Sequence, residues 1–409
     1  MTIPVDEILE DLEVSRAEPG PGFLERLFLR FNDRVPFETA TKILRQAAVA
    51  DPAARPRNPE IFWEERLASG AGGTCFARVA AFDALLSELG FSTRRALGRV
   101  RDDFDHAALL VSLAESDWIC DVGFPLPALL PPGTERAETG VGALVVRPSA
   151  RGIRIVFDGG VPEGPREVEI FSAAVSDDEF ETRWRATFRP DSNFLSQVLL
   201  HRQIESRKIS FARGEVRIDD LHSRTRIPIS GPRPAVLEEL FGMDAELLVA
   251  AFAIAGDGEP EFPDAKVEVF LEAPGSADAA YAAVASAPAY ARLHEGVAGH
   301  VVTTPAGPRA WDVRLAAPAA APGSAAAETA AVAERVSADD AGRSVRVERG
   351  GSISTWDVEE RHGRAWLIRR LTLAGPRLDL LRNDSMRGRI AGTLALDLLA
   401  WARRIGAES

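Results

Sequence analysis

The chain has 409 residues, more than one typical domain, and this length predicts two or three domains. Hydrophobic residues make up 46% and charged residues 27%, a balance that excludes a disordered or fibrous chain. The net charge of -13 argues against general binding to nucleic acid or anionic lipid, although a locally basic groove for an anionic cofactor remains compatible with it.

Cysteine usage and hydropathy indicate the compartment. Only two cysteines occur, Cys75 and Cys120, too few for a secreted disulfide scaffold, so we expect a reducing environment. The acidic, amphipathic N-terminus lacks the basic and apolar regions of a signal peptide. The most apolar stretch, residues 245–255, is far shorter than the ~20 residues of a membrane span. We therefore expect a cytoplasmic protein without a membrane partner.

The first part of the chain is predicted to be helical. Residues 1–60 carry apolar side chains at helix-like spacings, namely Leu9, Leu12, Phe23, Leu24, Leu27 and Phe28. A second amphipathic helix is predicted over residues 75–89, with Gly90 placed to end it. The period then changes to that of strands, which we expect at 94–101, 107–113, 117–124, 142–148 and 152–157.

Helices and strands mix over residues 180–230, and residues 233–248 are predicted to be a closing helical region. Gly, Pro and acidic residues at 255–263 are typical of a linker. Beyond it, strands are expected at 266–271, 310–315, 344–348, 352–359 and 365–373. Helices are expected at 278–293, with a kink or a new start at Pro288, and at 378–405. The Ala- and Pro-rich residues 316–333 are expected to form a poorly ordered loop.

Cys75 is the candidate nucleophile. It begins the predicted 75–89 helix, where the positive end of the helix dipole favours a thiolate. Gly72 and Gly73 allow a tight entry, and backbone N–H groups here are candidates for an oxyanion hole. The alternative is a buried structural cysteine, a common fate of free thiols.

His106 and Asp121 are the candidate partners of Cys75. They lie on two predicted strands joined by a short turn, and a turn centred near Glu115 makes Asp121 the diagonal neighbour of His106 on one face. An Asp–His hydrogen bond would orient the imidazole and stabilise its charged form. The alternative is a hydrogen-bonded core histidine. Strand alternation directs Cys120 to the opposite face, as inert packing.

Together these segments resemble the arylamine N-acetyltransferase family over residues 1–255. The resemblance rests on GGTCF with Cys75, DHAALLV with His106 and ICDVGF with Asp121. Weaker matches are VPFET (35–39), PDSNF (190–194) and LEELFGM (237–243).

The resemblance implies an α+β multidomain fold over residues 1–258: a helical bundle (about 1–90), a β-barrel (about 91–180) and an α/β lid (about 181–255). It implies ping-pong acyl transfer from acetyl-CoA, or another acyl thioester, through Cys75 to an arylamine or similar small amine. It also implies that Phe37 and Phe124 line the acceptor pocket, although core packing explains them equally. No residue is assigned to bind the acetyl-CoA co-substrate, and no permanent cofactor or metal is expected.

The sequence departs from the family motif beside the nucleophile. Ala71 stands where the family usually has Arg, and Ala77 where it usually has Glu or Gln. We therefore expect a buried ion pair near Cys75 to be missing, which puts the substrate in doubt more than the acyl-enzyme chemistry.

Residues 262–409 resemble a helix-grip domain of the polyketide-cyclase/START-like kind more faintly. Its order would be a first strand, helices, several antiparallel strands and a long last helix around a cavity for an apolar ligand. His294, His300 and His362 form no catalytic set there.

Four functions remain open: acetyl transfer to an arylamine, amide synthesis on a polyketide thioester, thiol hydrolysis of a transglutaminase-like kind, and a catalytically degenerate binding or scaffold module. The oligomeric state is not predicted.

Overall fold

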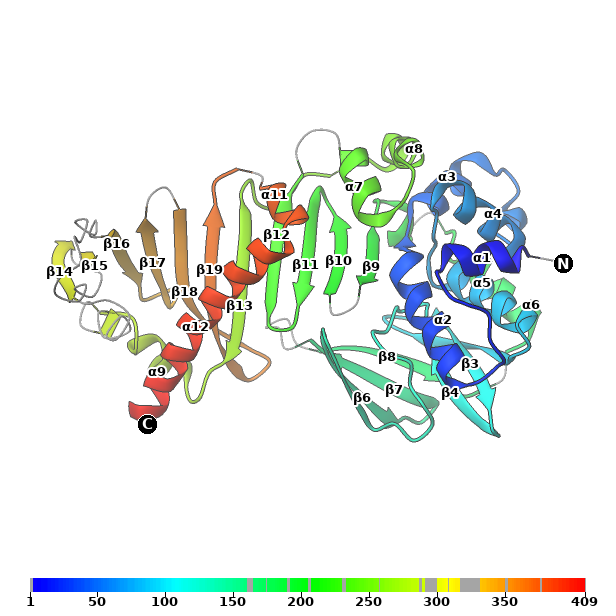
Figure 1. Cartoon of the computed structure of the whole chain (residues 1–409), viewed down its shortest axis with the longest axis horizontal. Helices are drawn as coiled ribbons and strands as arrows, with labels where there is room; N and C mark the ends of the chain where they lie inside the picture. Colours follow the sequence, from blue (N-terminus) through cyan, green and yellow to red (C-terminus); the bar gives the residue numbers. More distant parts are fainter. Residues whose placement is uncertain are drawn as a thin grey trace. The chain divides into compact units, whose positions relative to one another are not determined.

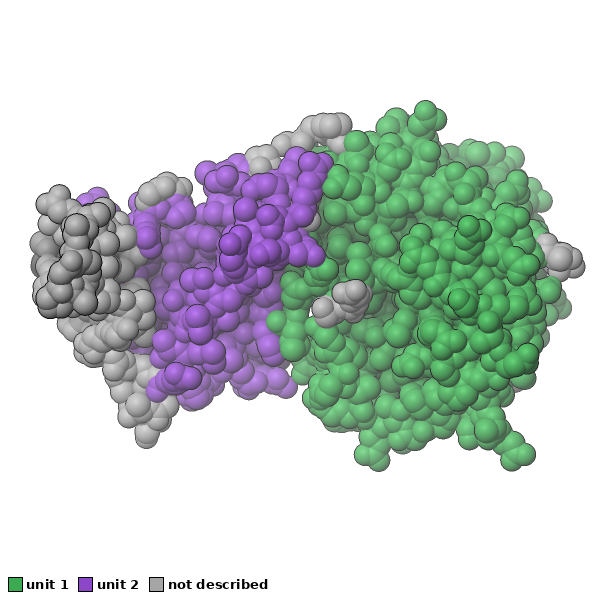
Figure 2. All heavy atoms as spheres, viewed as in Figure 1, with its two compact units in different colours: residues 1–159, 165–221, 229–261 green, residues 160–164, 222–228, 262–409 purple. Residues whose placement is uncertain are grey.

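The computed structural model divides the chain into two compact units (Figure 2). The described residues are 3–159, 165–173, 175–189, 192–204, 207–229, 233–256, 258–286, 289–290, 300–307, 309–316, 332–349, 352–375 and 377–408. Unit 1 contains residues 1–159, 165–221 and 229–261; unit 2 contains 160–164, 222–228 and 262–409. Each unit is built around its own apolar cluster.

Unit 1 opens with the predicted helices, interrupted by short loops (Figure 1). They are α1 (Val5–Asp11), α2 (Pro21–Arg34), α3 (Ala40–Ala48), α4 (Pro59–Ser69) and α5 (Cys75–Glu88), with the short 3-10 helix η1 (Pro52–Ala54) before α4. The side chain of Asn58 caps α4 by accepting from the Ile61 N–H at 2.9 Å. Gly90 follows α5 with a φ of +86° and donates to the Ser87 carbonyl, so the predicted end of this helix is confirmed.

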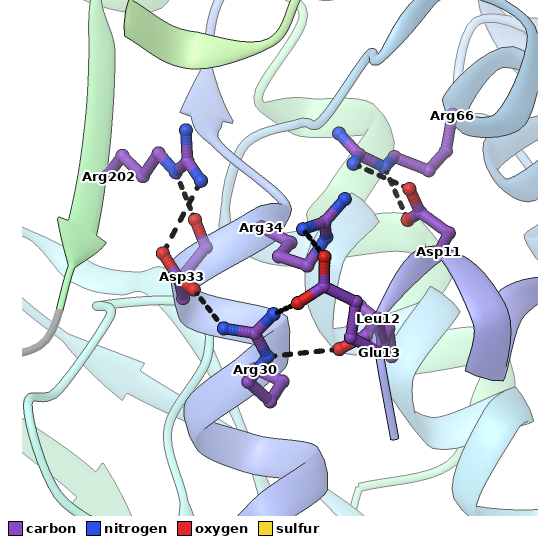
Figure 3. A network of polar contacts seen from close by, with 8 residues as sticks. All are labelled: Asp11, Leu12, Glu13, Arg30, Asp33, Arg34, Arg66 and Arg202. Atoms are coloured by element: carbon purple, nitrogen blue, oxygen red, sulfur yellow. Dashed lines mark hydrogen bonds and ion pairs between the residues drawn. The ribbon is translucent and has the colours of Figure 1, made fainter. Parts of the chain in front are cut away.

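A network of charged side chains fastens the first helices to one another (Figure 3). Arg30 of α2 bonds Asp33 at 2.7 Å and also contacts Glu13, which receives Arg34 at 2.7 Å. Asp33 in turn meets Arg202, from a strand far along the chain, at 3.4 Å. The network therefore ties the loop after α1 to α2 and to that distant strand.

The second part of unit 1 is an antiparallel sheet of seven strands. In chain order they are β2 (Ser92–Arg99), β3 (Asp103–Leu113), β4 (Ser116–Cys120), β5 (Arg136–Thr139), β6 (Gly142–Pro148), β7 (Gly152–Asp158) and β8 (Arg166–Phe171). Their spatial order is β4-β3-β2-β8-β7-β6-β5, and α5 packs against β2 and β3. Among the described residues no strand pairing joins the edges β4 and β5, and closure into the predicted barrel stays a prediction.

The third part of unit 1 mixes helices and strands, as predicted. It contains α6 (Asp177–Ala186), η2 (Asn193–Leu195), β9 (Leu200–Ile204), β10 (Arg207–Ala212), β11 (Glu215–Asp220), α7 (Arg233–Phe241) and α8 (Ala245–Ala255). The two-residue strand β1 (Phe37–Glu38) pairs with β9, and Phe37 also bridges Gly73 in parallel. Strand β1 therefore links this part to the loop that precedes Cys75.

Unit 2 is an antiparallel sheet crossed by a long helix (Figure 1). Its elements are β12 (Ser223–Pro228), β13 (Ala265–Glu272), α9 (Ala277–Ala282), β14 (His300–Gly307), β15 (Ala310–Ala316), β16 (Val332–Asp339), β17 (Ser344–Arg349), β18 (Ser352–Arg361), β19 (Arg364–Leu373), α11 (Asp379–Arg382) and α12 (Asp384–Glu408). The strand order is β12-β13-β19-β18-β17-β16-β15-β14, and α12 packs on β13 and β19. The helix-grip fold and its apolar ligand stay predictions.

Two expectations for unit 2 need correction, and others fall on residues that the structure does not describe. The predicted single helix 378–405 is two helices, because Asn383 leaves helical geometry and its side chain caps the Met386 N–H at 2.8 Å. Strand β16 already starts at residue 332, inside the predicted loop. His294, Pro288 and residues 317–331 lie outside the described residues. His300 begins β14, and His362 lies in the turn between β18 and β19.

Candidate active site

Cys75 is the first residue of α5, held there by two glycines. A Cβ on Gly72 would lie 1.8 Å from the Pro36 carbonyl oxygen, and one on Gly73 would lie 2.7 Å from Arg57 Nη2. Only glycine therefore allows this approach of the loop to β1. Cys75 exposes 6% of its surface, and its Sγ lies 3.8 Å from the Asp105 carbonyl oxygen. The preceding residue, Thr74, makes no side-chain cap to the first turn of the helix.

His106 and Asp121 meet in the core of the sheet. His106 Nε2 lies 2.9 Å from Asp121 Oδ2, and both side chains are buried. The other carboxylate oxygen, Oδ1, accepts the Phe124 N–H at 2.8 Å. The sequence predicts Asp121 within a strand, but β4 ends at Cys120. Asp121 lies in the turn that follows the strand. The reason is that its carboxylate bonds the backbone three residues ahead and closes that turn.

Gly123 brings the imidazole and the thiol together. A Cβ at this position would lie 3.0 Å from both Cys75 Cβ and His106 Cε1 and 2.1 Å from the Ala107 carbonyl oxygen. On the ring's opposite edge, a Cβ on Gly98 would lie 3.1 Å from His106 Cδ2. Since Asp121 occupies Nε2, the ring nitrogen left for the sulfur is Nδ1. The sequence-predicted residues Cys75, His106 and Asp121 therefore adjoin one another.

The protonation of His106 is set by these two neighbours. Burial by itself lowers the pKa of His106, but Asp121 and Cys75 outweigh burial and raise it to about 10. The imidazole therefore holds its proton at neutral pH, beside the sulfur. Cys120 differs, because burial and the adjacent Asp121 raise the pKa of this thiol. It is fully buried in β4 opposite Leu109.

Two buried guanidinium groups lie near Cys75, and one of them, Arg57, corrects the expectation that a buried ion pair is missing there. Arg57 donates to the Gly72 carbonyl oxygen, bonds Glu65 at 2.6 Å and lies 3.8 Å from the buried Glu38. Arg57 therefore supplies a guanidinium to the loop before Cys75, where Ala71 replaces the arginine that the resembled family usually has. Sequence reasoning missed Arg57 because the two positions are 14 residues apart.

The second guanidinium belongs to Arg78, one turn after Cys75 and fully buried. Its Nε donates to the Val122 carbonyl and its Nη2 to Asn32 Oδ1, both at 2.7 Å. Arg78 therefore fixes the segment that follows Asp121 against α5 and α2.

The phenylalanines predicted to line an acceptor pocket each face another ring. Phe124 faces the His106 ring edge-on, with centroids 6.5 Å apart, and Phe37 meets Phe194 at 5.7 Å. Both Phe37 and Phe124 are half-buried against the core. Their role toward a substrate stays a prediction.

Beside Cys75 the structure contains a hollow that the sequence did not reveal. It is narrow, with room for about one water-sized group, and opens to solvent at its mouth. Its lining comprises Thr41, Lys42, Arg45, Arg55, Arg57, Thr74, Ala77, Trp184 and Phe188. A single lysine in an amphipathic helix is usually exposed, so no pattern marked Lys42, yet it exposes only 5% of its surface. Burial lowers the pKa of Lys42 to about 8, an effect that the nearby Cys75 partly opposes.

The sequence around this geometry matches a known family. A family model described as N-acetyltransferase matches residues 22–141, which include Cys75, His106 and Asp121. Residues 22–141 therefore resemble the N-acetyltransferase family. The chain is 36% identical, over 108 residues, to an arylamine N-acetyltransferase from Escherichia coli (strain K12). That alignment covers 25% of this chain and 36% of the relative, so the chain matches about a third of the relative's length.

A shorter match, 34% identical over 73 residues, relates it to proansamycin X synthase from Amycolatopsis mediterranei (strain S699). This match covers 16% of the chain and 28% of that relative.

Solved structures extend the likeness of fold beyond the matched sequence. The arylamine N-acetyltransferase from Salmonella typhimurium aligns with a TM-score of 0.53 at 20% identity, over 62% of this chain and 99% of that chain. The Mycobacterium marinum arylamine N-acetyltransferase in complex with CoA aligns with a TM-score of 0.53 at 18% identity, over 60% and 97%. The N-acetyltransferase fold therefore continues well past residue 141.

Two kinds of feature are absent from the described residues. No group of three or more His, Cys, Asp or Glu side chains is arranged to hold a metal ion there. None of the helices in this part of the chain combines the length and the apolarity that crossing a bilayer requires.

Proposed function

We propose that this chain is an acyltransferase that carries an acyl group on Cys75 from a CoA-type thioester to an arylamine or similar amine. The observation that carries the proposal is the buried chain of contacts from Asp121 through His106 to Cys75, which begins a helix. A sulfur beside a protonated imidazole is a nucleophile at neutral pH.

The geometry suggests a two-stage reaction. The Cys75 sulfur attacks the thioester carbonyl, the S–C bond of the acyl-enzyme forms, and the donor thiol leaves with a proton from His106 Nδ1. The amine then attacks the acyl-enzyme, His106 accepts the amine proton, and the Cys75 thiolate leaves. Backbone N–H groups in the first turn of α5, which Thr74 does not cap, are suited to stabilise the oxyanion of each step.

A second candidate is amide synthesis on a polyketide thioester. It is favoured by the similarity to proansamycin X synthase. Both candidates need the same three residues and differ in the acyl donor.

Intact mass spectrometry distinguishes these functions. The full chain, incubated with acetyl-CoA and no acceptor, should gain one acetyl group that is absent from Cys75→Ala. An adduct that forms only with longer or carrier-bound thioesters would favour the amide synthase. Rapid turnover of peptide or amide bonds would indicate a hydrolase, and a thiol without reactivity toward any thioester would indicate a binding or scaffold module.

A further inference from the structure

Arg78 is a buried cation beside the candidate active site that the proposed reaction leaves without a role. It lies one turn after Cys75 in α5 and exposes none of its surface. Its Nε donates to the Val122 carbonyl at 2.7 Å, its Nη1 to the Val35 carbonyl, and its Nη2 to Asn32 Oδ1 at 2.7 Å. These acceptors are uncharged, and no carboxylate among the described residues lies within ion-pair distance of the guanidinium. Arg78 therefore lacks the direct anionic partner that a buried charge ordinarily has.

Arg78 and Asn32 together hold the turn that begins at Asp121. Arg78 bonds the carbonyl of the residue after Asp121, and Asn32 Nδ2 donates to the Leu126 carbonyl at 3.2 Å. The Leu126 N–H in turn donates to the backbone carbonyl of Asp121 at 3.2 Å. The turn is thus fixed at both ends, with the guanidinium against the peptide that follows Asp121.

Asp121 is the principal counter-charge of this guanidinium. Burial lowers the pKa of Arg78 to about 9, and Asp121 opposes this more than any other group does. The other charged groups that act on Arg78, each more weakly, are Glu38, Arg66 and Cys75. Glu38 has Arg57 as its own partner. Arg78 therefore stays charged at neutral pH, and its charge is balanced chiefly by Asp121.

This charge matters most once Cys75 carries an acyl group. In the first stage of the proposed reaction His106 gives its proton to the departing thiol, which leaves a neutral imidazole beside the buried carboxylate of Asp121. Without a nearby cation, that buried negative charge would draw a proton back onto the Asp121–His106 pair, and the imidazole could not accept one from the amine. With Arg78 the acyl-enzyme cluster carries no net charge, so the imidazole stays free.

We propose that Arg78 is a positioning residue that offsets the charge of Asp121 in the acyl-enzyme and so keeps His106 unprotonated until the amine arrives. The inference rests on the proposed function, because it concerns the second stage of that reaction. A merely structural role would have the opposite effect on titration. A turn loosened by the loss of Arg78 would carry Asp121 away from His106 and lower the pKa of the imidazole, whereas loss of the positive charge raises it.

Titration of His106 in a Cys75→Ser background tests the offset without any acyl transfer. The serine hydroxyl stays neutral, like an acylated sulfur, and nitrogen NMR of the imidazole reports its protonation, with the signal assigned from its loss in His106→Gln. Adding Arg78→Gln, which removes the charge, should raise the pKa of His106 by about one pH unit, the effect of one charge several ångströms away. Adding Arg78→Lys, which keeps the charge, should leave the pKa close to that of the parent. The matched control is Arg66→Gln, which removes another buried guanidinium and should leave the pKa unchanged.

A pKa of His106 that stays the same or falls in Arg78→Gln would overturn the proposal, as would an equal rise in Arg78→Lys. Should the double variants not fold, Cys75→Ser alone decides. In that variant the pKa of His106 should drop from about 10 to below about 8, near the working pH, because the sulfur no longer favours the imidazolium. A pKa that remains near 10 would show that Arg78 does not offset Asp121.

Kinetics then locate the effect within the reaction. In the chain that keeps Cys75, Arg78→Gln should slow amine attack on the acyl-enzyme about tenfold at pH 7 and move its pH profile upward, while acylation of Cys75 changes less. Equal slowing of both stages would overturn the assignment to the acyl-enzyme. A chain that shows the shifted titration but forms no acyl adduct would contradict the proposed function alone.

Discussion

His106 is confined by its neighbours on every edge that the structure describes. Asp121 takes Nε2, while Gly98 and Gly123 leave just enough room for Cδ2 and Cε1. The motif strings around Cys75, His106 and Asp121 predicted that these residues act together, and the structure brings them close; their catalytic role stays a prediction. Lys42 and Arg57 escaped detection because their partners lie far away in the sequence.

Replacing Asp121 by Asn tests the charge that holds the imidazolium. The amide keeps the size of the side chain but loses the negative charge, so the pKa of His106 should fall and less thiolate should form. We expect the rate of Cys75 alkylation by iodoacetamide at pH 7 to drop about 10²-fold or more. The matched control is Asp117→Asn in the same hairpin, which loses only surface contacts to Arg94 and Ser112. An equal effect of both changes would contradict the role of Asp121.

Lys42→Met should raise the free energy of unfolding, and the gain should be larger at pH 7 than at pH 10. Burial lowers the pKa of Lys42 from 10.5 to about 8, so between these values the unfolded chain binds a proton that the folded chain does not. Stability of the wild type therefore rises with pH across this window as the penalty disappears. Below pH 8 Lys42 is charged in both states, and burying its ammonium then lowers the free energy of unfolding by about 3 kcal/mol, at 1.36 kcal/mol per pKa unit.

Urea unfolding at pH 7 and pH 10 measures this difference. The advantage of Lys42→Met should be largest at pH 7 and shrink by pH 10. The contribution of His106 has the opposite sign, since its raised pKa makes stability fall between pH 6.5 and about 10, but it is common to both proteins and cancels. An advantage that is constant with pH would show that Lys42 does not lose its proton in this window.

At the scale of elements, the position of Cys75 depends on the loop between α4 and α5. The loop's glycines pack against β1 and the residue before it. Arg57 donates to the Gly72 carbonyl oxygen and also lies close to Glu38. The α5 helix was predicted to within one residue because Gly90 ends it and the apolar stripe is strong. The α11–α12 break was missed, because an asparagine inside an amphipathic pattern resembles any polar surface residue until its cap is seen.

Arg57→Met should loosen this loop and leave the carboxyl group of Glu38 buried without its guanidinium. We expect a loss of about 3–5 kcal/mol in the free energy of unfolding, the usual cost of removing one partner of a buried pair. The double variant Arg57→Met/Glu38→Gln should recover part of this loss, because no buried charge then remains. Urea unfolding of the four proteins of this cycle measures the coupling, with Arg94→Met as the surface control. Strictly additive losses would show that the two side chains do not interact.

At the scale of the whole molecule, the described residues give each unit a large apolar cluster of its own. One surrounds α5 and the seven-stranded sheet, and the other lies between α12 and the sheet of unit 2. The change of composition at 255–263 predicted a break, and the units divide at residues 261 and 262. Strand β12 belongs to unit 2, which the sequence could not reveal because its pairing with β13 spans the linker.

Trp401→Ala tests whether unit 1 keeps its site when unit 2 is weakened. Trp401 is fully buried, its indole N–H donates to the Ala280 carbonyl at 2.8 Å, and its ring packs on Trp356. Removing it should cost unit 2 about 3–5 kcal/mol. Calorimetry should record a lower transition for unit 2, while the rate of Cys75 alkylation at 25 °C stays within twofold of wild type. The exposed Leu396, on the same helix, offers Leu396→Ala as a control. A parallel loss of alkylation would contradict this expectation.

The groups that surround the sulfur occupy a continuous stretch of chain. Cys75, His106, Asp121 and Gly123 all precede residue 125, and Arg57 comes earlier still. A ribosome has therefore made the entire reactive cluster while most of the polypeptide remains to be translated. The nascent N-terminal portion can start to enclose its thiol before the strands of unit 2 leave the exit tunnel.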